Sequence, residues 1–152
     1  MPRLSTGAPI NRGRIVFGMA SEYESKVYRI LKDAGVKFKR EYTFKDLKSY
    51  RGKRLRYDFA VFNYNNQLEC LIEVHGAQHY QYIQHFHKTK QQWNYAREMD
   101  LRKAHYAITH YIPFYVIPYT DVDKVNTFAD LCSNKYKITT KWYLYQQENT
   151  EG

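Results

Sequence analysis

The sequence predicts an α/β fold, a mixed central β-sheet flanked by helices with elements in the order α-β-β-β-α-β-α. Three runs between residues 38 and 74 alternate apolar and polar side chains, as half-buried strands do. Helical periodicity precedes these runs at 21–34 and follows them at 91–109. A short apolar run at 112–117 then provides a further strand. Helices on both sides of strands in one chain are typical of a sheet covered by helices.

The first helix is expected to begin at Ser21 and to end at Ala34. Ser21 and Glu24 have the spacing of a capping box, and Gly35 is a typical residue at which a helix stops. The preceding stretch, 1–20, carries two prolines, three glycines and three arginines. We therefore expect a flexible basic arm over 1–20 and a single domain over 21–152.

The strand-like runs are 38–44, 55–61 and 68–74, and Asn63–Asn66 is expected to form the turn between the last two. A polar, histidine-rich stretch leads to the long helix at 91–109. After the strand at 112–117, Asp121 is expected to cap a closing helix that ends at Leu131. The segment 138–145 has an ambiguous pattern.

The overall charge favours a polyanionic partner. The chain carries 24 Lys and Arg against 15 Asp and Glu, a formal charge of +9, which is typical of proteins that bind nucleic acid or anionic membranes. The apolar stretch Ile112–Pro118 is far shorter than the roughly 20 residues that span a bilayer. No secretory signal is visible, and Cys70 and Cys132 give neither a disulfide framework nor a zinc motif. We expect nucleic acid rather than a membrane, and a reducing, cytoplasmic setting.

Two acidic residues lie inside apolar strands. Asp58 and Glu73 each fall on the face opposite their strand's main apolar stripe, and a hairpin between the strands would place both carboxylates close together. Such burial is costly unless the charge is paired or bound to a metal. Carboxylate oxygens suit Mg²⁺, which can activate a water and neutralise charge on a phosphodiester. The alternative is structural: Asp58 pairs with Arg56, and Glu73 with His75 or a lysine.

Four motifs carry a family resemblance. Asp58, fourteen intervening residues and then Glu73-Val74-His75 resembles the core motif of the PD-(D/E)XK nuclease superfamily. The segment 71–80 (LIEVHGAQHY) is similar to the E-x-D-G-x-Q-H-[FY] segment of a very-short-patch-repair-like branch, which includes phage and intron-associated endonucleases. Ser21-x-x-Glu24 resembles that branch's first helix, and Asp100-x-x-Lys103-x-x-Tyr106 resembles its D-x-x-K-x-x-[YW] helix. The motifs occur in the family's order between residues 21 and 121.

The resemblance implies a restriction-endonuclease-like core and a metal-dependent DNA endonuclease that hydrolyses phosphodiester bonds, of the phage or homing type. It implies that Asp58 and Glu73, with Glu24, hold Mg²⁺, for which Mn²⁺ is expected to substitute. If the protein is encoded by a phage, its setting is the cytoplasm of a bacterial cell. Two alternatives stay open: a catalytically impaired DNA-binding module of the same fold, and a structure-specific nuclease that nicks mismatches or resolves Holliday junctions.

Four further residues are candidates for catalysis. His75 stands where the superfamily has a lysine, and since histidine titrates near neutral pH it can serve as base, acid or ligand. Gln78 and His79 follow Gly76 closely enough to turn back toward the metal, where they would position or deprotonate water. Lys103 would stabilise charge on the phosphate. The structural alternatives are a capping role for Glu24, a polar loop for Gln78 and His79, and a solvated helix charge for Lys103.

A basic strip provides the expected surface for double-stranded DNA. Residues 37–56 include nine Lys or Arg and two acids, with aromatic residues interleaved. The strip contains a loop between the first two strands, beside the Asp58 strand. The expected DNA-binding residues are Lys48, Arg51, Lys53, Arg54 and Arg56. The alternative is an ordinary solvated surface, and whether the protein is a monomer or a homodimer stays open.

Overall fold

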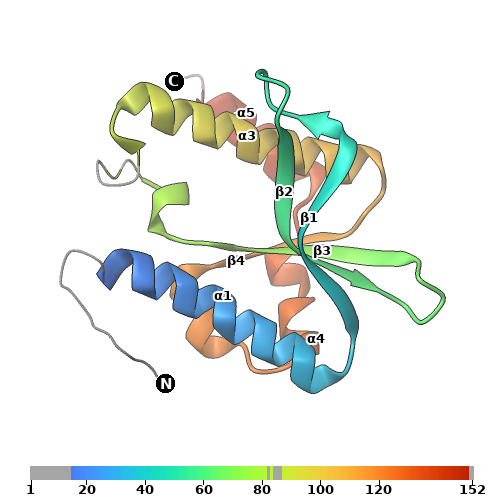
Figure 1. Ribbon diagram of the computed structural model, residues 1–152. Coiled ribbons are helices and arrows are strands. Elements are labelled where there is room, and N and C mark those ends of the chain that lie inside the picture. Colours follow the sequence, from blue (N-terminus) through green and yellow to red (C-terminus); the bar gives the residue numbers. More distant parts are fainter. Residues whose placement is uncertain (1–14, 82, 84–86, 151–152) are drawn as a thin grey trace.

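The structure is a computed structural model that describes residues 15–81, 83 and 87–150, and the side chains of these except 15–21 and 150. Most of the basic arm predicted over 1–20, namely residues 1–14, lies outside the described residues. A four-stranded sheet lies between two helical layers (Figure 1). The elements are α1 (Ile15–Ala34), β1 (Lys37–Lys48), β2 (Arg54–Phe62), β3 (Leu68–His75), η3 (Ala77–His79), α3 (Lys90–Thr109), β4 (Phe114–Pro118), η4 (Tyr119–Lys124), α4 (Phe128–Leu131), η5 (Asn134–Tyr136) and α5 (Thr140–Thr150).

The sheet is mixed, as the sequence predicts. Its strand order is β1-β2-β3-β4, in which β1 and β3 run antiparallel to β2 while β4 runs parallel to β3. The tight turn at Asn63–Asn66 is confirmed, since the Asn66 amide donates to the Asn63 carbonyl over 2.9 Å. The chain crosses from β3 to the parallel β4 through α3, which is the connection a parallel pair requires.

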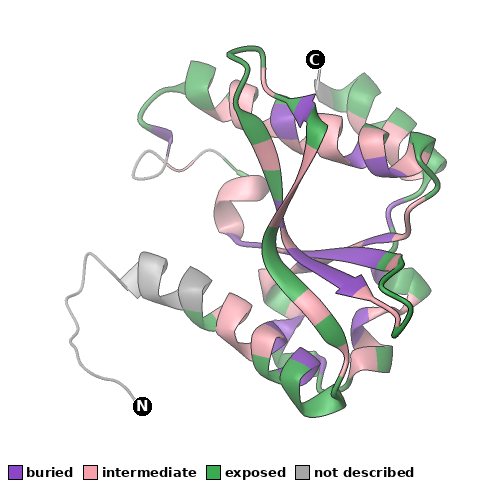
Figure 2. Ribbon diagram, turned by 45° about the vertical axis from the view of Figure 1, so that its right-hand side comes forward, coloured by how far each residue is buried: buried purple, intermediate pink, exposed green. Residues whose placement is uncertain are grey.

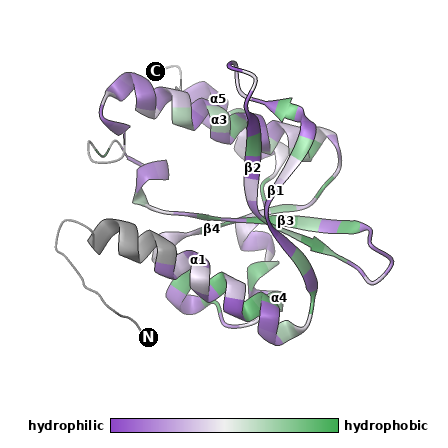
Figure 3. Ribbon diagram, in the orientation of Figure 1, coloured by the Kyte–Doolittle hydropathy of each residue, from purple (hydrophilic) through white to green (hydrophobic). Residues whose placement is uncertain are grey.

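Each face of the sheet has its own apolar core. Toward α1 and α4 the buried residues include Leu31, Phe59 and Ile72, and toward α3 they include Leu71 and Ala107. Figure 2 shows buried positions along the middle of the sheet, and Figure 3 shows hydrophobic residues in the strands and largely hydrophilic residues along α3. Within the described residues, no helix combines the length and the apolar character needed to cross a membrane.

The predicted start of the first helix is wrong. α1 begins at Ile15, so Ser21 and Glu24 lie within the helix and not at its start. Residues 15–20 contain no proline and a single glycine, and Met19 and Ala20 are good helix formers, so nothing in this stretch stops the helix. The predicted end is confirmed, since Gly35 follows Ala34 with φ +71°, a conformation that glycine adopts readily.

The predicted start of the closing helix at Asp121 is also wrong, while its predicted end at Leu131 is confirmed. Asp121 lies in the 3₁₀ segment η4, where its carboxylate accepts a hydrogen bond from the Tyr136 hydroxyl (2.9 Å). The helix α4 begins only after Thr127, which forms a capping box with Asp130. Because this box satisfies free amides of the short helix, it sets the start in place of Asp121. The ambiguous segment 138–145 resolves into Ile138, which donates to the Phe114 carbonyl, and the beginning of α5.

Candidate active site

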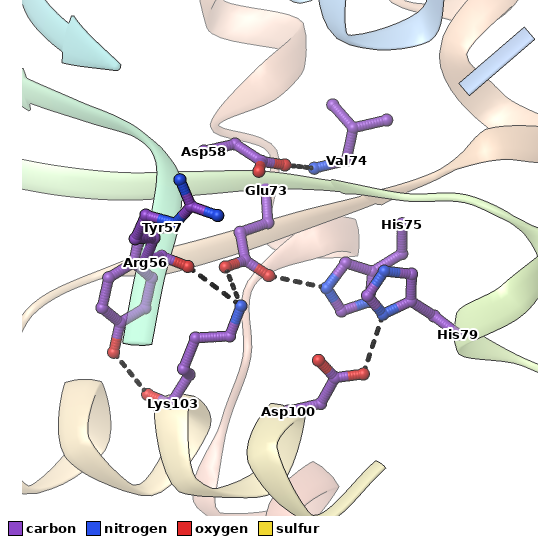
Figure 4. A network of polar contacts seen from close by, with 9 residues as sticks. All are labelled: Arg56, Tyr57, Asp58, Glu73, Val74, His75, His79, Asp100 and Lys103. Carbon is purple, nitrogen blue, oxygen red and sulfur yellow. Dashed lines mark hydrogen bonds and ion pairs between the residues drawn. The ribbon is translucent and has the colours of Figure 1, made fainter. Parts of the chain in front are cut away.

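Glu73 lies at the centre of a polar network between the sheet and α3. It lies two residues before the end of β3 and is buried, with 2% of its surface exposed. Its carboxylate accepts hydrogen bonds from His75 Nε2 (2.8 Å) and from Lys103 Nζ, which also donates to the Arg56 carbonyl (3.1 Å). Figure 4 shows Lys103 and His75 approaching this carboxylate from different sides. The lysine and the histidine together satisfy an otherwise costly buried charge.

The pair of Glu73 and Lys103 stays ionised despite its burial. Burial alone would raise the pKa of Glu73, but the charge of Lys103 and the hydrogen bond from His75 outweigh it, and the net pKa is lowered. Burial alone would lower the pKa of Lys103, but Glu73 and Asp100 outweigh it, and the net pKa is raised. A cation therefore stays at this end of β3, although the position two residues after Glu73 holds a histidine.

Asp58 lies beside Glu73 in the sheet. The β2–β3 register pairs Phe59 with Ile72, so Asp58 and Glu73 each directly adjoin the last paired position of their strand. There the Asp58 carboxylate accepts a hydrogen bond from the Val74 amide (2.8 Å, Figure 4). Burial, and next the charge of Glu73, raise the pKa of Asp58 to about 7. The two acids thus lie near each other on neighbouring strands, since the Val74 amide binds Asp58 and the charge of Glu73 acts on it.

The structural alternatives for these acids have different outcomes. Arg56 does not pair with Asp58, because its guanidinium contacts Glu41 (2.7 Å) on β1. Glu73 does contact His75, as that alternative supposed, and it contacts Lys103 in addition. Asp58 is therefore the acid whose charge is least compensated, and its raised pKa is the sign of this.

A second part of the network joins two histidines to α3. The rings of His75 and His79 are stacked, with centroids 3.8 Å apart and 12° between their planes. A hydrogen bond of 2.8 Å links His79 Nδ1 to an oxygen of Asp100. Burial would raise the pKa of Asp100, but the hydrogen bond with His79 and the nearby positive groups lower it to about 2. Asp100 therefore stays an anion that orients His79.

Asp100 is the site residue that the reasoning on individual residues missed. In the sequence it stands out only as the first residue of the Asp100-x-x-Lys103-x-x-Tyr106 motif, which by itself assigns it no role in the site. The available signal was its spacing: residues three apart lie on the same face of a helix, so Asp100 and Lys103 project from α3 together. Both reach the network at the end of β3.

Two other predicted site residues lie at the margin of the network. Glu24, on α1, contacts Arg40 (3.0 Å), and its negative charge contributes to the raised pKa of Asp58. Gln78 lies in η3 with its side-chain amide folded over Gly76, where a Cβ would meet the amide oxygen at 2.5 Å. Gly76 thus leaves the space that this side chain occupies.

The donor chemistry around Asp58 fits a hard divalent cation. Oxygen ligands are what Mg²⁺ prefers, and it is commonly held by one or two carboxylates. Asp58 and Glu73 supply such oxygens from adjacent strands, and Glu24 adds negative charge nearby. Burial, and next the charge of Glu73, raise the pKa of Asp58, and a bound cation would relieve the repulsion between the two carboxylates.

The basic strip is exposed and carries aromatic contacts. All five predicted DNA-binding residues are exposed, and residues 49–53 connect β1 to β2. The Arg102 guanidinium lies 4.0 Å from the ring centre of Tyr50 and donates to the Lys48 carbonyl (2.9 Å), and that of Arg51 lies 5.7 Å from the ring of Tyr95. These contacts attach the loop to α3, the helix that carries Lys103.

Comparison with known proteins identifies little. No protein-family model matches the chain, and no solved structure matches it. An uncharacterized protein, 307L, of Invertebrate iridescent virus 6 is 31% identical over 72 residues, which are 47% of this chain. The match covers 36% of that viral protein, little more than a third of its length. The chain is therefore similar to one part of a longer viral protein whose printed name gives no activity.

Proposed function

We propose that the protein is a metal-dependent DNA endonuclease that hydrolyses phosphodiester bonds, of the kind encoded by phages or mobile elements. The observation that carries the proposal is that Asp58 and Glu73 lie near each other on adjacent strands, while Lys103 from the helix packed against the sheet binds Glu73. Two carboxylates for a metal and a cation for a phosphate are the groups that such hydrolysis needs. The mixed sheet flanked by helices supports the restriction-endonuclease-like core that the motifs imply.

Each residue has a role in this reaction. Asp58 and Glu73 bind the divalent cation, with Glu24 adding negative charge at the rim. When bound, Mg²⁺ supplies neutralisation of the phosphate charge and lowers the pKa of a coordinated water. Lys103 Nζ, which the Arg56 carbonyl and Glu73 hold in place, donates to a phosphate oxygen.

The two histidines act on the attacking water. His79 is oriented by Asp100 through Nδ1, which leaves its Nε2 to accept a proton from the attacking water. His75 is stacked on that ring and held by Glu73, so it keeps His79 in this orientation. Gln78 lies one residue before His79 and helps to position the water. The exposed cations of the basic strip bind the DNA backbone.

The decisive experiment uses supercoiled plasmid. The full chain is incubated with plasmid and Mg²⁺ or Mn²⁺, and nicked and linear products are measured against a reaction that contains EDTA. The isosteric variants Asp58→Asn and Glu73→Gln should abolish cleavage because each removes a ligand charge. Glu69→Gln is the matched control, since Glu69 is an exposed acid on the same strand as Glu73.

The outcomes separate the functional classes. Cleavage that needs the metal, is lost in both variants and persists in Glu69→Gln supports the nuclease. Cleavage in EDTA, or at the wild-type rate in Glu73→Gln, contradicts it. Binding to the plasmid without any metal-dependent cleavage would instead make the protein a DNA-binding module.

A further inference from the structure

His75, His79 and Asp100 form a cluster that the proposed nuclease chemistry does not need as metal ligands. One ring nitrogen of each histidine and one oxygen of Asp100 lie within 4.8 Å of one another. The three residues come from the end of β3, from η3 and from α3, so three elements fix their positions. Figure 4 shows the two rings overlapping beside the Asp100 carboxylate.

The donor atoms of this cluster differ from those at Asp58. Two imidazole nitrogens and one carboxylate oxygen suit transition-metal ions such as Zn²⁺, whereas Mg²⁺ prefers oxygen alone. Three protein ligands with the remaining positions open to water is also the arrangement common in zinc sites that are accessible to substrate. The donor set of the cluster therefore favours a transition-metal ion over Mg²⁺.

The surroundings support a metal at this position. The three residues line a cavity of about 100 Å³, whose wall also includes Tyr80 and Trp142. This volume accommodates an ion and a few waters, because a water occupies roughly 30 Å³ of liquid volume. Glu73 accepts a hydrogen bond from His75, and such outer contacts to a carboxylate commonly orient histidines that bind metals.

We propose that His75, His79 and Asp100 bind one divalent transition-metal ion of the Zn²⁺ class. Each histidine contributes one ring nitrogen and Asp100 contributes a carboxylate oxygen, while water fills the open positions. Because a ring nitrogen coordinates in the plane of its ring, one of the two rings turns out of the stacked arrangement when the ion binds. The ion replaces the hydrogen bond between His79 Nδ1 and the Asp100 oxygen, which now lie 2.8 Å apart, and the proton of that bond is released to solvent. The site is distinct from the Mg²⁺ position at Asp58, and Glu73 connects the two.

The test is metal binding by the untagged full chain, without DNA. Isothermal titration calorimetry with Zn²⁺ alone should give one equivalent bound with micromolar or tighter affinity, and millimolar Mg²⁺ should not displace it. Titration with Co²⁺ alone should give visible absorption bands from a nitrogen-containing ligand set. His79→Ala should weaken Zn²⁺ binding by at least about tenfold, since even loss of an outer contact commonly costs 10- to 100-fold.

Three further variants locate the ion. Asp100→Asn should lose the site as His79→Ala does, while His105→Ala, which removes an exposed histidine of the same helix, should bind normally. Asp58→Asn should keep full Zn²⁺ binding. If Asp100→Asn does not fold by circular dichroism, His79→Ala decides, because the His79 side chain is 24% exposed and tolerates truncation.

The result that overturns the proposal is equally specific. It fails if the wild type binds no stoichiometric Zn²⁺, or if His79→Ala binds as tightly as the wild type. It also fails if Asp58→Asn loses the ion to the same extent as His79→Ala, because the ion then lies at the carboxylates. A His79 that binds this ion through Nδ1 cannot also accept a proton from water, so the Zn²⁺-bound form is distinct from the form in which His79 acts as the base. None of these readouts measures DNA cleavage, so their failure does not bear on the proposed nuclease activity.

Discussion

Lys103 of α3 and Glu73 of β3 form a buried ion pair between residues 30 positions apart in the chain. Their side chains are 13% and 3% exposed, and the lysine also donates to the Arg56 carbonyl on β2. One side chain of the helix thus contacts two strands at the point where the candidate site lies. The packing of α3 on the sheet and the electrostatics of the site are therefore coupled.

Lys103→Met should destabilise the protein strongly. Removing one partner of a buried pair leaves an uncompensated charge on Glu73, which commonly costs about 3 to 5 kcal/mol. The double variant Lys103→Met with Glu73→Gln should be more stable than Lys103→Met alone, since the unpaired charge is gone. Urea unfolding of the wild type, both single variants and the double variant measures this coupling.

Lys32→Met is the control for that series, because Lys32 is an exposed lysine near the end of α1. It should change stability by about 0.5 kcal/mol or less. A double variant no more stable than Lys103→Met would show that the two charges do not depend on each other.

Asp58 should make stability depend on pH. Its pKa in the folded protein is raised to about 7 from an ordinary value of 3.8, so the folded state favours the protonated form. Below about pH 4 Asp58 is protonated in both the folded and the unfolded state and does not reduce the free energy of unfolding. As pH rises from 4 toward 7, the unfolded state loses this proton first, so the free energy of unfolding falls. Asp58→Asn, measured in EDTA, should therefore become more stable relative to the wild type over this range, by up to about 1.4 kcal/mol per pH unit.

The measurement is urea unfolding of both proteins at intervals from pH 4 to 8. Other titrating groups are common to the two proteins and cancel in the difference. Asp123→Asn, which changes an exposed aspartate, is the matched control. A difference between wild type and Asp58→Asn that stays flat with pH would show that Asp58 is not strained by burial and by Glu73.

Tyr57→Phe should cost about 1 kcal/mol of stability. The buried Tyr57 hydroxyl donates to the backbone carbonyl of Lys103 over 2.8 Å, and a typical internal hydrogen bond contributes about that much. Tyr64→Phe should be neutral, because Tyr64 is 92% exposed. Thermal unfolding of the two variants checks this, and equal melting temperatures would contradict the stabilising role of the Tyr57 contact.

The basic strip should determine the salt dependence of DNA binding. Each phosphate contact contributes a slope of roughly 0.9 in log K against log salt, so changing four cations of the strip to alanine should flatten it by about 2 to 4. Binding to unrelated DNA sequences should weaken alike. The variant combines K48A, R51A, K53A and R54A, and fluorescence anisotropy over a salt series measures the slope.

Arg56→Ala should change the slope of log K against log salt less than the loss of one loop cation does, since Arg56 is already paired with Glu41. The matched control removes the same number of exposed cations from the opposite end of β1 and from α1, in the variant R29A, K32A, K37A and K39A. If this control flattens the slope and the loop variant does not, DNA lies against α1 and the strip is only solvated surface.

Much of the framework follows from local sequence alone. Alternation in 55–61 and 68–74, with the Asn63–Asn66 turn between them, determines a hairpin, which brings Asp58 of β2 near Glu73 of β3. Gly35 determines the end of α1 through its positive φ. These features depend on residues within a few positions of one another, so the pattern contains what decides them.

The tertiary structure alone decided which charges meet. Asp58 had Arg56 two residues away, yet Arg56 contacts Glu41 across the sheet, and the cation beside Glu73 comes from α3. Asp121 has the residue type of a helix cap, but its carboxylate accepts a hydrogen bond from the Tyr136 hydroxyl. The helix starts instead at the capping box of Thr127. The stacking of His75 on His79, and the contact of His79 with Asp100, depend on how α3 packs on the sheet. Packing of this kind sums many weak contacts between distant segments, and no local periodicity encodes the result.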